Sequence, residues 1–247
     1  MAATPLLLLP GLMTDARVWD PLIHAASAQR LIVIGQTHTA DNIAELAAQA
    51  VASMPDGPFA VAGFSLGGYV ALELCRQAPE HVAGLALIDT SARADTAEAR
   101  QNRERMVAAL RSGEATFARA IAGFPAKLFH GHHAEDPRLV RLLEGMARST
   151  GQAGFIRQQT AAMHRQDGRD VLKSLRCPAL VLCGVDDQVT PPERSQEMAD
   201  LLAGDVELVT VPSAGHMTTL EQPQAVVQPF LRWLGKVDAA RDGESVV

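Results

Sequence analysis

The fold is decided by the stretch Phe59-Ala60-Val61-Ala62-Gly63-Phe64-Ser65-Leu66-Gly67-Gly68-Tyr69-Val70. It opens with an apolar run of strand length, and from Leu66 a helical pattern runs to about Gln77 and stops before Pro79. Between them, Gly63-x-Ser65-x-Gly67 makes a tight turn, in which the glycines leave room where a Cβ would clash. We therefore expect a strained Ser65 with its hydroxyl exposed at a helix N-terminus, where the helix dipole favours negative charge.

Further apolar runs of strand length occur along the rest of the chain. They are mostly continuous rather than alternating, which is typical of strands buried on both faces of a parallel sheet. Helical patterns lie between several of them: one is expected to be N-capped by Asp41, and another runs from about Pro192 to before Gly204. The sequence predicts an α/β fold with a mostly parallel sheet of about six strands flanked by helices. The predicted strands are residues 6–9, 31–34, 59–62, 85–88, 179–183 and 206–211.

One long interval breaks this alternation of strands and helices. Residues 91–175 contain helical and polar stretches but no convincing strand, so they are expected to form a helical cap inserted into the core. The core is then made of residues 1–90 and 176–236. Residues 237–247 are polar and lack periodicity, and we expect a flexible tail there.

Composition excludes several classes of protein. The net charge is −6 and the chain has no basic block, so nucleic acid is not an expected partner. The N-terminus has no basic region of a signal peptide, and the apolar run 6–9 is too short for a membrane span. Three cysteines are too few for a disulfide framework and are typical of a reducing compartment. A cytoplasmic protein without a membrane partner is expected, and its oligomeric state is left open.

A serine nucleophile needs a base, and the base needs an acid that orients it. Asp186 and Asp187 follow the predicted strand 179–183, and His216 follows the strand 206–211. Together with Ser65 they lie after the carboxyl ends of parallel strands, which meet at one edge of the sheet. The spacing alone leaves Asp186 and Asp187 equally open as the acid. Asp89 also ends a strand and is a third candidate, although a cap or brace at the start of the insertion is its plainer interpretation.

Four motifs resemble those of the alpha/beta-hydrolase fold, in its esterase, enol-lactonase and C–C-hydrolase branch. They are Leu9-Pro10-Gly11-Leu12, Gly63-Phe64-Ser65-Leu66-Gly67-Gly68, Gly184-x-x-Asp187-x-x-Thr190-Pro191 and Ala214-Gly215-His216. The resemblance covers nearly all of residues 4–234. It implies that Asp187 is the acid and that the backbone N–H groups of Leu12 and Leu66 form an oxyanion hole.

The chain departs from this family in two places. Pro10 stands where the family usually has a histidine, which puts the bracing of that loop in question. The antiparallel hairpin that often precedes the first parallel strand is missing, and residues 35–39 lack the usual glycine-rich loop. The predicted sheet is therefore a trimmed version of the family's, with the candidate triad intact.

The expected function is a serine hydrolase that cleaves small ester, lactone or activated acyl substrates through an acyl-enzyme. Ser65, His216 and Asp187 would act as nucleophile, base and orienting acid, and no cofactor is implied. The alternatives are a C–C-bond hydrolase or lyase with the same triad and a low-turnover receptor for small molecules. The segment His130-Gly131-His132-His133 lacks cysteines or a carboxylate pair at ligand spacing, so no metal site is predicted there.

Overall fold

A computed structural model describes residues 3–28 and 30–244. The described part of the chain contains a six-stranded sheet in the order β2-β1-β3-β4-β5-β6, and all neighbouring strands are parallel. The strands β1, β3 and β5 are buried along their whole length, which explains their unbroken apolar sequences. The predicted fold class is confirmed. The strands are β1 (Leu6–Leu9), β2 (Ile32–Ile34), β3 (Phe59–Phe64), β4 (Val82–Ile88), β5 (Ala179–Gly184) and β6 (Val206–Val211).

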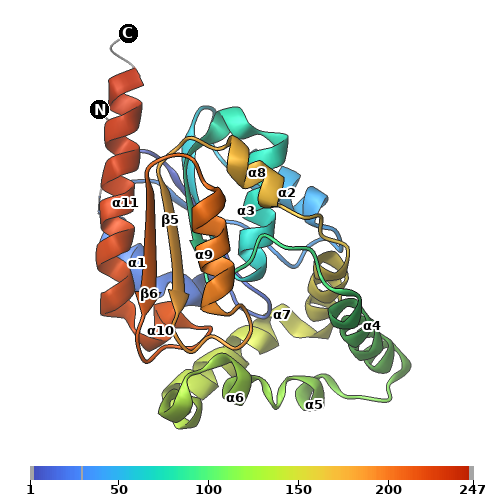
Figure 1. Cartoon of the computed structure of the whole chain (residues 1–247). Coiled ribbons are helices and arrows are strands. Elements are labelled where there is room, and N and C mark those ends of the chain that lie inside the picture. The colour runs from blue at the N-terminus through green and yellow to red at the C-terminus, as the bar shows by residue number, and fades with distance from the viewer. Residues whose placement is uncertain (1–2, 29, 245–247) are drawn as a thin grey trace.

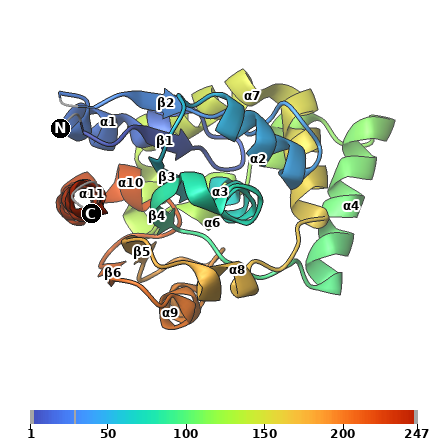
Figure 2. The ribbon, with the colours of Figure 1, turned by 90° about the horizontal axis from the view of Figure 1, so that it is seen from above.

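Helices cover both faces of the sheet (Figures 1 and 2). On one face α1 (Asp20–Ala26) packs beside the long α11 (Pro223–Glu244) over a core that includes Trp19, Phe230 and Trp233. On the other face α2 (Ile43–Ala52), α3 (Leu66–Gln77) and α9 (Pro192–Leu201) enclose a mainly aliphatic core. Because successive side chains of a strand point to opposite faces, each strand contributes to both cores.

A run of helices lies across the carboxyl ends of the strands (Figure 1). These are α4 (Ala97–Ser112), α5 (Phe117–Ile121), α6 (Phe124–Leu128) and α7 (Pro137–Met163). Helix α7 is interrupted by a kink at Gly151. The next helix, α8 (Arg169–Ser174), packs against α3 and α9 instead. The division of the chain into a core and a cap at residues 91 and 175 stays a prediction. Short elements complete the list: η1 (Ala16–Trp19), η2 (Pro79–His81), η3 (Gly131–Glu135) and α10 (Thr218–Glu221).

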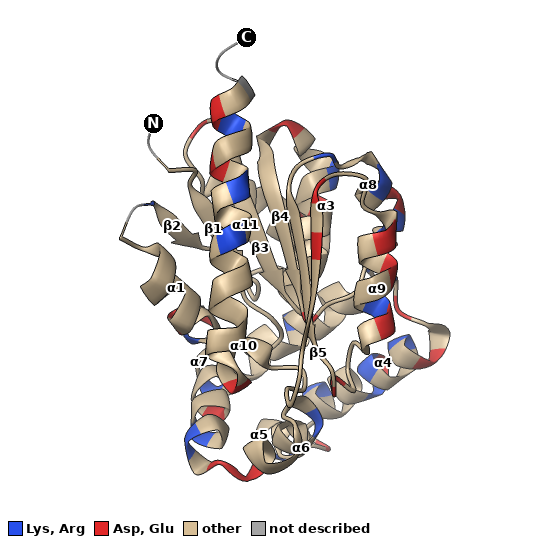
Figure 3. Cartoon of the chain, turned by 60° about the vertical axis from the view of Figure 1, so that its left-hand side comes forward, with Lys and Arg blue, Asp and Glu red and all other residues tan. Residues whose placement is uncertain are grey.

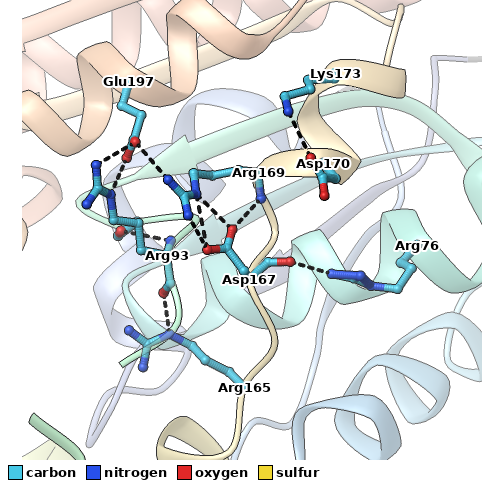
Figure 4. A network of polar contacts seen from close by, with 9 residues as sticks. Arg76, Arg93, Arg165, Asp167, Arg169, Asp170, Lys173 and Glu197 are labelled. Carbon is cyan, nitrogen blue, oxygen red and sulfur yellow. Dashed lines mark hydrogen bonds and ion pairs between the residues drawn. The ribbon is translucent and has the colours of Figure 1, made fainter. Parts of the chain in front are cut away.

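A network of ion pairs ties the end of this helical segment to the core (Figure 4). Glu197 on α9 accepts two hydrogen bonds from Arg93 and lies 3.5 Å from Arg169 on α8. Arg169 in turn pairs with Asp167, whose carbonyl accepts a hydrogen bond from Arg76 on α3. Each pair is partly exposed and contributes little alone, but together they join α8 to both α9 and α3.

Two expectations at helix ends are wrong. The N-cap of α2 is Asn42 rather than Asp41, since the Asn42 side chain accepts a hydrogen bond of 2.7 Å from the backbone N–H of Glu45. The tail expected from residue 237 is helical as far as Glu244, because Val237 is fully buried in the core and Asp238 accepts a hydrogen bond from the N–H of Thr4. Residues 245–247 of that expected tail lie outside the described residues.

The helices within residues 3–28 and 30–244 are too short or too polar to span a lipid bilayer.

Candidate active site

Ser65 lies in a strained turn between β3 and α3. Its φ of 51° is in the left-handed region that residues other than glycine rarely adopt. The two glycines of the motif make the turn possible. A Cβ at Gly63 would lie 2.5 Å from the carbonyl oxygen of Gly67, and one at Gly67 would lie 1.9 Å from that of Leu9. The turn therefore holds the Ser65 hydroxyl at the N-terminus of α3, as its sequence predicts.

A hydrogen-bonded line runs from Ser65 through His216 to Asp187. The Ser65 hydroxyl oxygen lies 2.8 Å from His216 Nε2, and His216 Nδ1 lies 2.7 Å from Asp187 Oδ2. The three residues come from the loops after β3, β6 and β5, and each is at most 9% exposed. The Phe64 ring packs against the imidazole with 5.6 Å between ring centroids. This geometry can pass a proton from a hydroxyl to an imidazole that a carboxylate orients.

The Asp187 carboxylate is held by donors from its own loop. The N–H groups of Val189 and Thr190 donate to Oδ1, and the Thr190 hydroxyl donates to Oδ2. Burial alone would raise the pKa of Asp187, but the His216 imidazole and these hydrogen bonds outweigh burial and lower it. Asp186 is exposed, and its carboxylate lies 3.5 Å from His130 Nε2. The structure thus brings Asp187, and not Asp186, to His216.

Asp89 is fully buried beside these loops, and its hydrogen bonds go to residues other than His216. Its Oδ1 accepts from the N–H of Gly184, and its Oδ2 accepts from the N–H and the hydroxyl of Thr218. It therefore joins the loop before Asp187 to the loop after His216. Burial, followed by the nearby charge of Asp187, raises the pKa of Asp89 well above its ordinary value. The brace that the sequence suggested for Asp89 exists, but it links the two candidate triad loops rather than the insertion.

The loop after β1 presents backbone N–H groups near Ser65. The N–H of Leu12 donates to no group among the described residues, and the N–H of Leu66 opens α3 without an intrahelical acceptor. The next residue, Met13, has a φ of 58°, and its N–H donates over 3.0 Å to Gln158 Oε1. Gln158 belongs to α7 and is fully buried.

The other end of the Gln158 amide completes the bracing of this loop. Its Nε2 lies 3.3 Å from both the carbonyl of Gly11 and the hydroxyl of Thr37. The Thr14 hydroxyl accepts from the N–H of Gly11 over 2.7 Å. The loop that lacks the family's usual histidine is therefore held by a glutamine from the helical insertion. Sequence reasoning missed Gln158, because nothing in its local pattern distinguishes it from its neighbours on α7.

A second missed residue, Glu221, holds the loop that carries His216. Glu221 Oε1 accepts from the N–H groups of Gly215 and Met217, the neighbours of His216 on both sides. Its Oε2 accepts from the N–H of His130 and lies 3.0 Å from His133 Nδ1. Part of the histidine segment therefore supports the loop of His216. Among the described residues, His, Cys, Asp and Glu side chains do not gather in threes at a spacing that could hold a metal ion.

A cavity of about 270 Å³ opens above Ser65. Ser65 and His216 line it together with Leu12 and Leu66, whose N–H groups have no acceptor within the described part of the chain. The insertion supplies about half of the lining residues through α4, α6 and α7, and the core also contributes Met13, Phe64, Tyr69, Val189 and Met217. Such a volume suits a small organic molecule whose reacting carbonyl lies against Ser65. The wall residues from these helices are Ala99, Asn102, Arg103, Met106, Phe124, Lys127, Leu128, Gln159 and Ala162.

Comparison with known proteins identifies the family. The model of the alpha/beta hydrolase family matches residues 6–228, which is nearly the whole chain. The chain belongs to the alpha/beta hydrolase family. The resemblance inferred from the sequence motifs is confirmed, and this hydrolase has relatives and structural neighbours that are esterases and other hydrolases.

Three known proteins illustrate how similar this chain is to characterised hydrolases in sequence or structure. The hydrolase is 34% identical over 188 residues to a pimeloyl-[acyl-carrier protein] methyl ester esterase of Neisseria meningitidis, covering 73% of this chain and 71% of the relative. A thermophilic esterase from Thermogutta terrifontis superposes with a TM-score of 0.85 at 28% identity, covering 96% of this chain and 91% of the esterase. The enol-lactonase of Burkholderia xenovorans has a TM-score of 0.80 at 21% identity, covering 94% and 92%, and this similarity bears on the fold.

Proposed function

We propose that this hydrolase cleaves small ester, lactone or activated acyl substrates with Ser65 as nucleophile, His216 as base and Asp187 as the orienting acid. The observation that carries the proposal is the line of two short contacts, 2.8 Å and 2.7 Å, from the Ser65 hydroxyl through the imidazole to the carboxylate. The esterase relatives support an acyl substrate.

The reaction has two steps. In the first, Ser65 Oγ attacks the substrate carbonyl while its proton passes to His216 Nε2, and the resulting oxyanion accepts hydrogen bonds from the N–H groups of Leu12 and Leu66. The carbonyl re-forms as the bond to the leaving alcohol breaks, and His216 returns the proton to that alcohol. In the second step water attacks the acyl-enzyme along the same route and releases the acid. Asp187 holds the imidazole tautomer and stabilises the imidazolium in both steps.

The helical insertion acts in this proposal as a cap that limits substrate size. Its helices supply half of the residues that line the cavity of about 270 Å³, so a compact acyl group fits and a polymer does not. We also propose a cytoplasmic location for the enzyme, which is supported by three free thiols, at Cys75, Cys177 and Cys183.

The test is turnover of p-nitrophenyl acetate together with labelling by a fluorophosphonate probe. The wild type should hydrolyse the ester and take up the label at Ser65, and Ser65→Ala should lose both while its circular dichroism spectrum is unchanged. Ser112→Ala, the same change at an exposed serine on α4, is the matched control and should behave as the wild type.

The alternatives give different results. Labelling that persists in Ser65→Ala would assign the nucleophile to another residue. A wild type that is labelled but turns over esters feebly would favour a C–C-bond hydrolase or lyase. A wild type that is neither labelled nor active would favour a small-molecule receptor with this fold.

A further inference from the structure

The charges that line the cavity above Ser65 are of one sign. Apart from His216, the charged side chains on its walls are Arg103 from α4 and Lys127 from α6. None of the described Asp and Glu side chains lines the cavity. Apolar side chains make up most of the remaining wall, and ionic interactions are stronger beside such surfaces than in open water.

Helix α4 presents one face to the cavity. Ala99, Asn102, Arg103 and Met106 follow the spacing i, i+3, i+4, i+7 and therefore lie on one side of the helix. The Arg103 guanidinium is fixed on that side: Nε donates to Asp95 over 2.7 Å, and Nη1 donates to Gln159 over 2.5 Å. Its third nitrogen, Nη2, has no hydrogen-bond acceptor among the described residues. Arg103 is thus held in place by two hydrogen bonds and can still donate from Nη2 to a ligand.

The positive charge of this wall is not neutralised by its neighbours. The buried carboxylate of Asp95 is shared, because its other oxygen accepts from Arg165 over 2.5 Å. Two guanidinium groups therefore face one carboxylate. Lys127 is exposed and has no ion-pair partner in the described part of the chain. An anion in the cavity would balance this excess through charge-assisted hydrogen bonds.

The wider charge distribution has the same sign. Residues 91–175 contain 14 Lys and Arg against nine Asp and Glu, whereas the rest of the chain contains eight against 19. Figure 3 shows basic residues as blue segments along α4 and α7, with acidic residues in red between them. A field of this sign raises the local concentration of anionic ligands.

We propose that Arg103, Asn102 and Lys127 form a subsite for a free carboxylate, so that the preferred substrates are half-esters of dicarboxylic acids. The ester carbonyl lies at Ser65 and the second carboxylate lies against α4 and α6. The turnover of half-esters rests on the proposed function, because it needs Ser65 as nucleophile. The carboxylate subsite can be tested by binding alone.

The experiment compares monomethyl adipate with methyl hexanoate, which replaces the carboxylate by a methyl group. Both release methanol, so one assay serves both. We expect kcat/KM to be at least about tenfold higher for the half-ester, and KM for the half-ester alone to rise with added salt. Arg103→Gln should remove most of this preference, because it should lower kcat/KM for the half-ester far more than kcat/KM for methyl hexanoate. Lys127→Gln should lower the preference less, because its side chain is exposed.

Arg100→Gln is the matched control, because Arg100 is an exposed arginine on the same helix that does not line the cavity. Equal rates for the two esters in the wild type, or an equal loss for both in Arg103→Gln, would overturn the subsite. If neither ester is turned over, the proposed function fails and calorimetry decides the subsite. Binding of adipate that Arg103→Gln weakens and Arg100→Gln does not would support it, and a wild type that does not bind adipate would overturn it.

Discussion

Gln158→Met is the substitution that best tests how the loop beside Ser65 is held. Methionine has nearly the length of glutamine but cannot replace the hydrogen bonds of Gln158 to Met13, Gly11 and Thr37. The N–H of Met13 would remain buried without an acceptor, and that residue already has a φ of 58°. Its strained conformation would lose the contact that holds it.

The cost follows from these contacts. A buried donor left unsatisfied costs about 1–3 kcal/mol, and the two contacts of 3.3 Å add less than a full hydrogen bond each. We therefore expect the free energy of unfolding to fall by about 2–4 kcal/mol. For a protein of 247 residues this lowers Tm by roughly 4–16 °C.

In Gln158→Met, kcat should fall by more than the loss of folded protein explains. The loop that Gln158 braces carries the N–H of Leu12, and removal of one oxyanion donor costs about 10²–10³ in kcat. A displaced donor should cost part of that, so we expect kcat for p-nitrophenyl acetate to fall about 10- to 100-fold at a temperature where the variant is folded, with little change in KM.

The assay combines thermal unfolding by circular dichroism with steady-state kinetics. Gln152→Met is the matched control, since Gln152 lies on the same helix, is exposed, and its side chain makes one hydrogen bond among the described residues, to the carbonyl of Leu110 over 3.4 Å. A Gln158→Met protein with the Tm and kcat of the wild type would refute the brace. A lower Tm with unchanged kcat would show that the loop keeps its geometry without Gln158.

Three further predictions concern the triad and its turn. Asp187→Asn should lower kcat by about 10⁴, because the amide can hold the wrong imidazole tautomer, whereas Asp186→Asn should stay within about threefold of the wild type in the same ester assay. The pKa of Asp187 is lowered below its ordinary value of 3.8, so its ionised form stabilises the fold above that pH. Urea unfolding should show this contribution being lost as the pH falls below 3.8, and the loss should be absent in Asp187→Asn. Gly67→Ala should prevent folding or cost more than about 4 kcal/mol, since its Cβ would lie 1.9 Å from the carbonyl oxygen of Leu9, whereas Gly235→Ala on α11 meets no atom within 4 Å and should unfold in urea no earlier than the wild type.

The sheet could be predicted closely because buried parallel strands are marked in the sequence by continuous apolar runs. The sequence predicts a helix over about residues 66–77, and α3 spans Leu66–Gln77. The sequence does not identify the functional residue where two similar residues are neighbours. Asp41 and Asn42 can both cap a helix, and the register of α2 places Asn42 at the cap. Asp186 and Asp187 were separated only by resemblance to a family motif, and the structure places Asp187 beside His216.

The supporting residues of the site could not be predicted, because their partners are distant in the sequence. Gln158 contacts Met13 across 145 residues, and Asp89 contacts Thr218 across 129. The contact of Gln158 forms because α7 packs over the strand ends. The contact of Asp89 forms because the loops after β4 and β6 meet at the same edge of the sheet. The helical end of α11 was missed for a similar reason. Val237 is one apolar residue in a polar stretch, and its burial depends on the contact with Gly84 of β4.

The interruption of α7 at Gly151 has a consequence for how the protein opens. With φ 66° and ψ 170° at this glycine, the helical hydrogen-bond ladder stops, and α7 is mechanically two shorter helices. Leu143 and Met146 of the first half pack with the core on the α11 side, whereas Ala161 and Ala162 of the second half pack with the core on the α3 side. The halves are then expected to exchange their amide hydrogens for deuterium as separate cooperative units. Opening of the first half alone would admit solvent while the second half, which carries Gln158, stays protected.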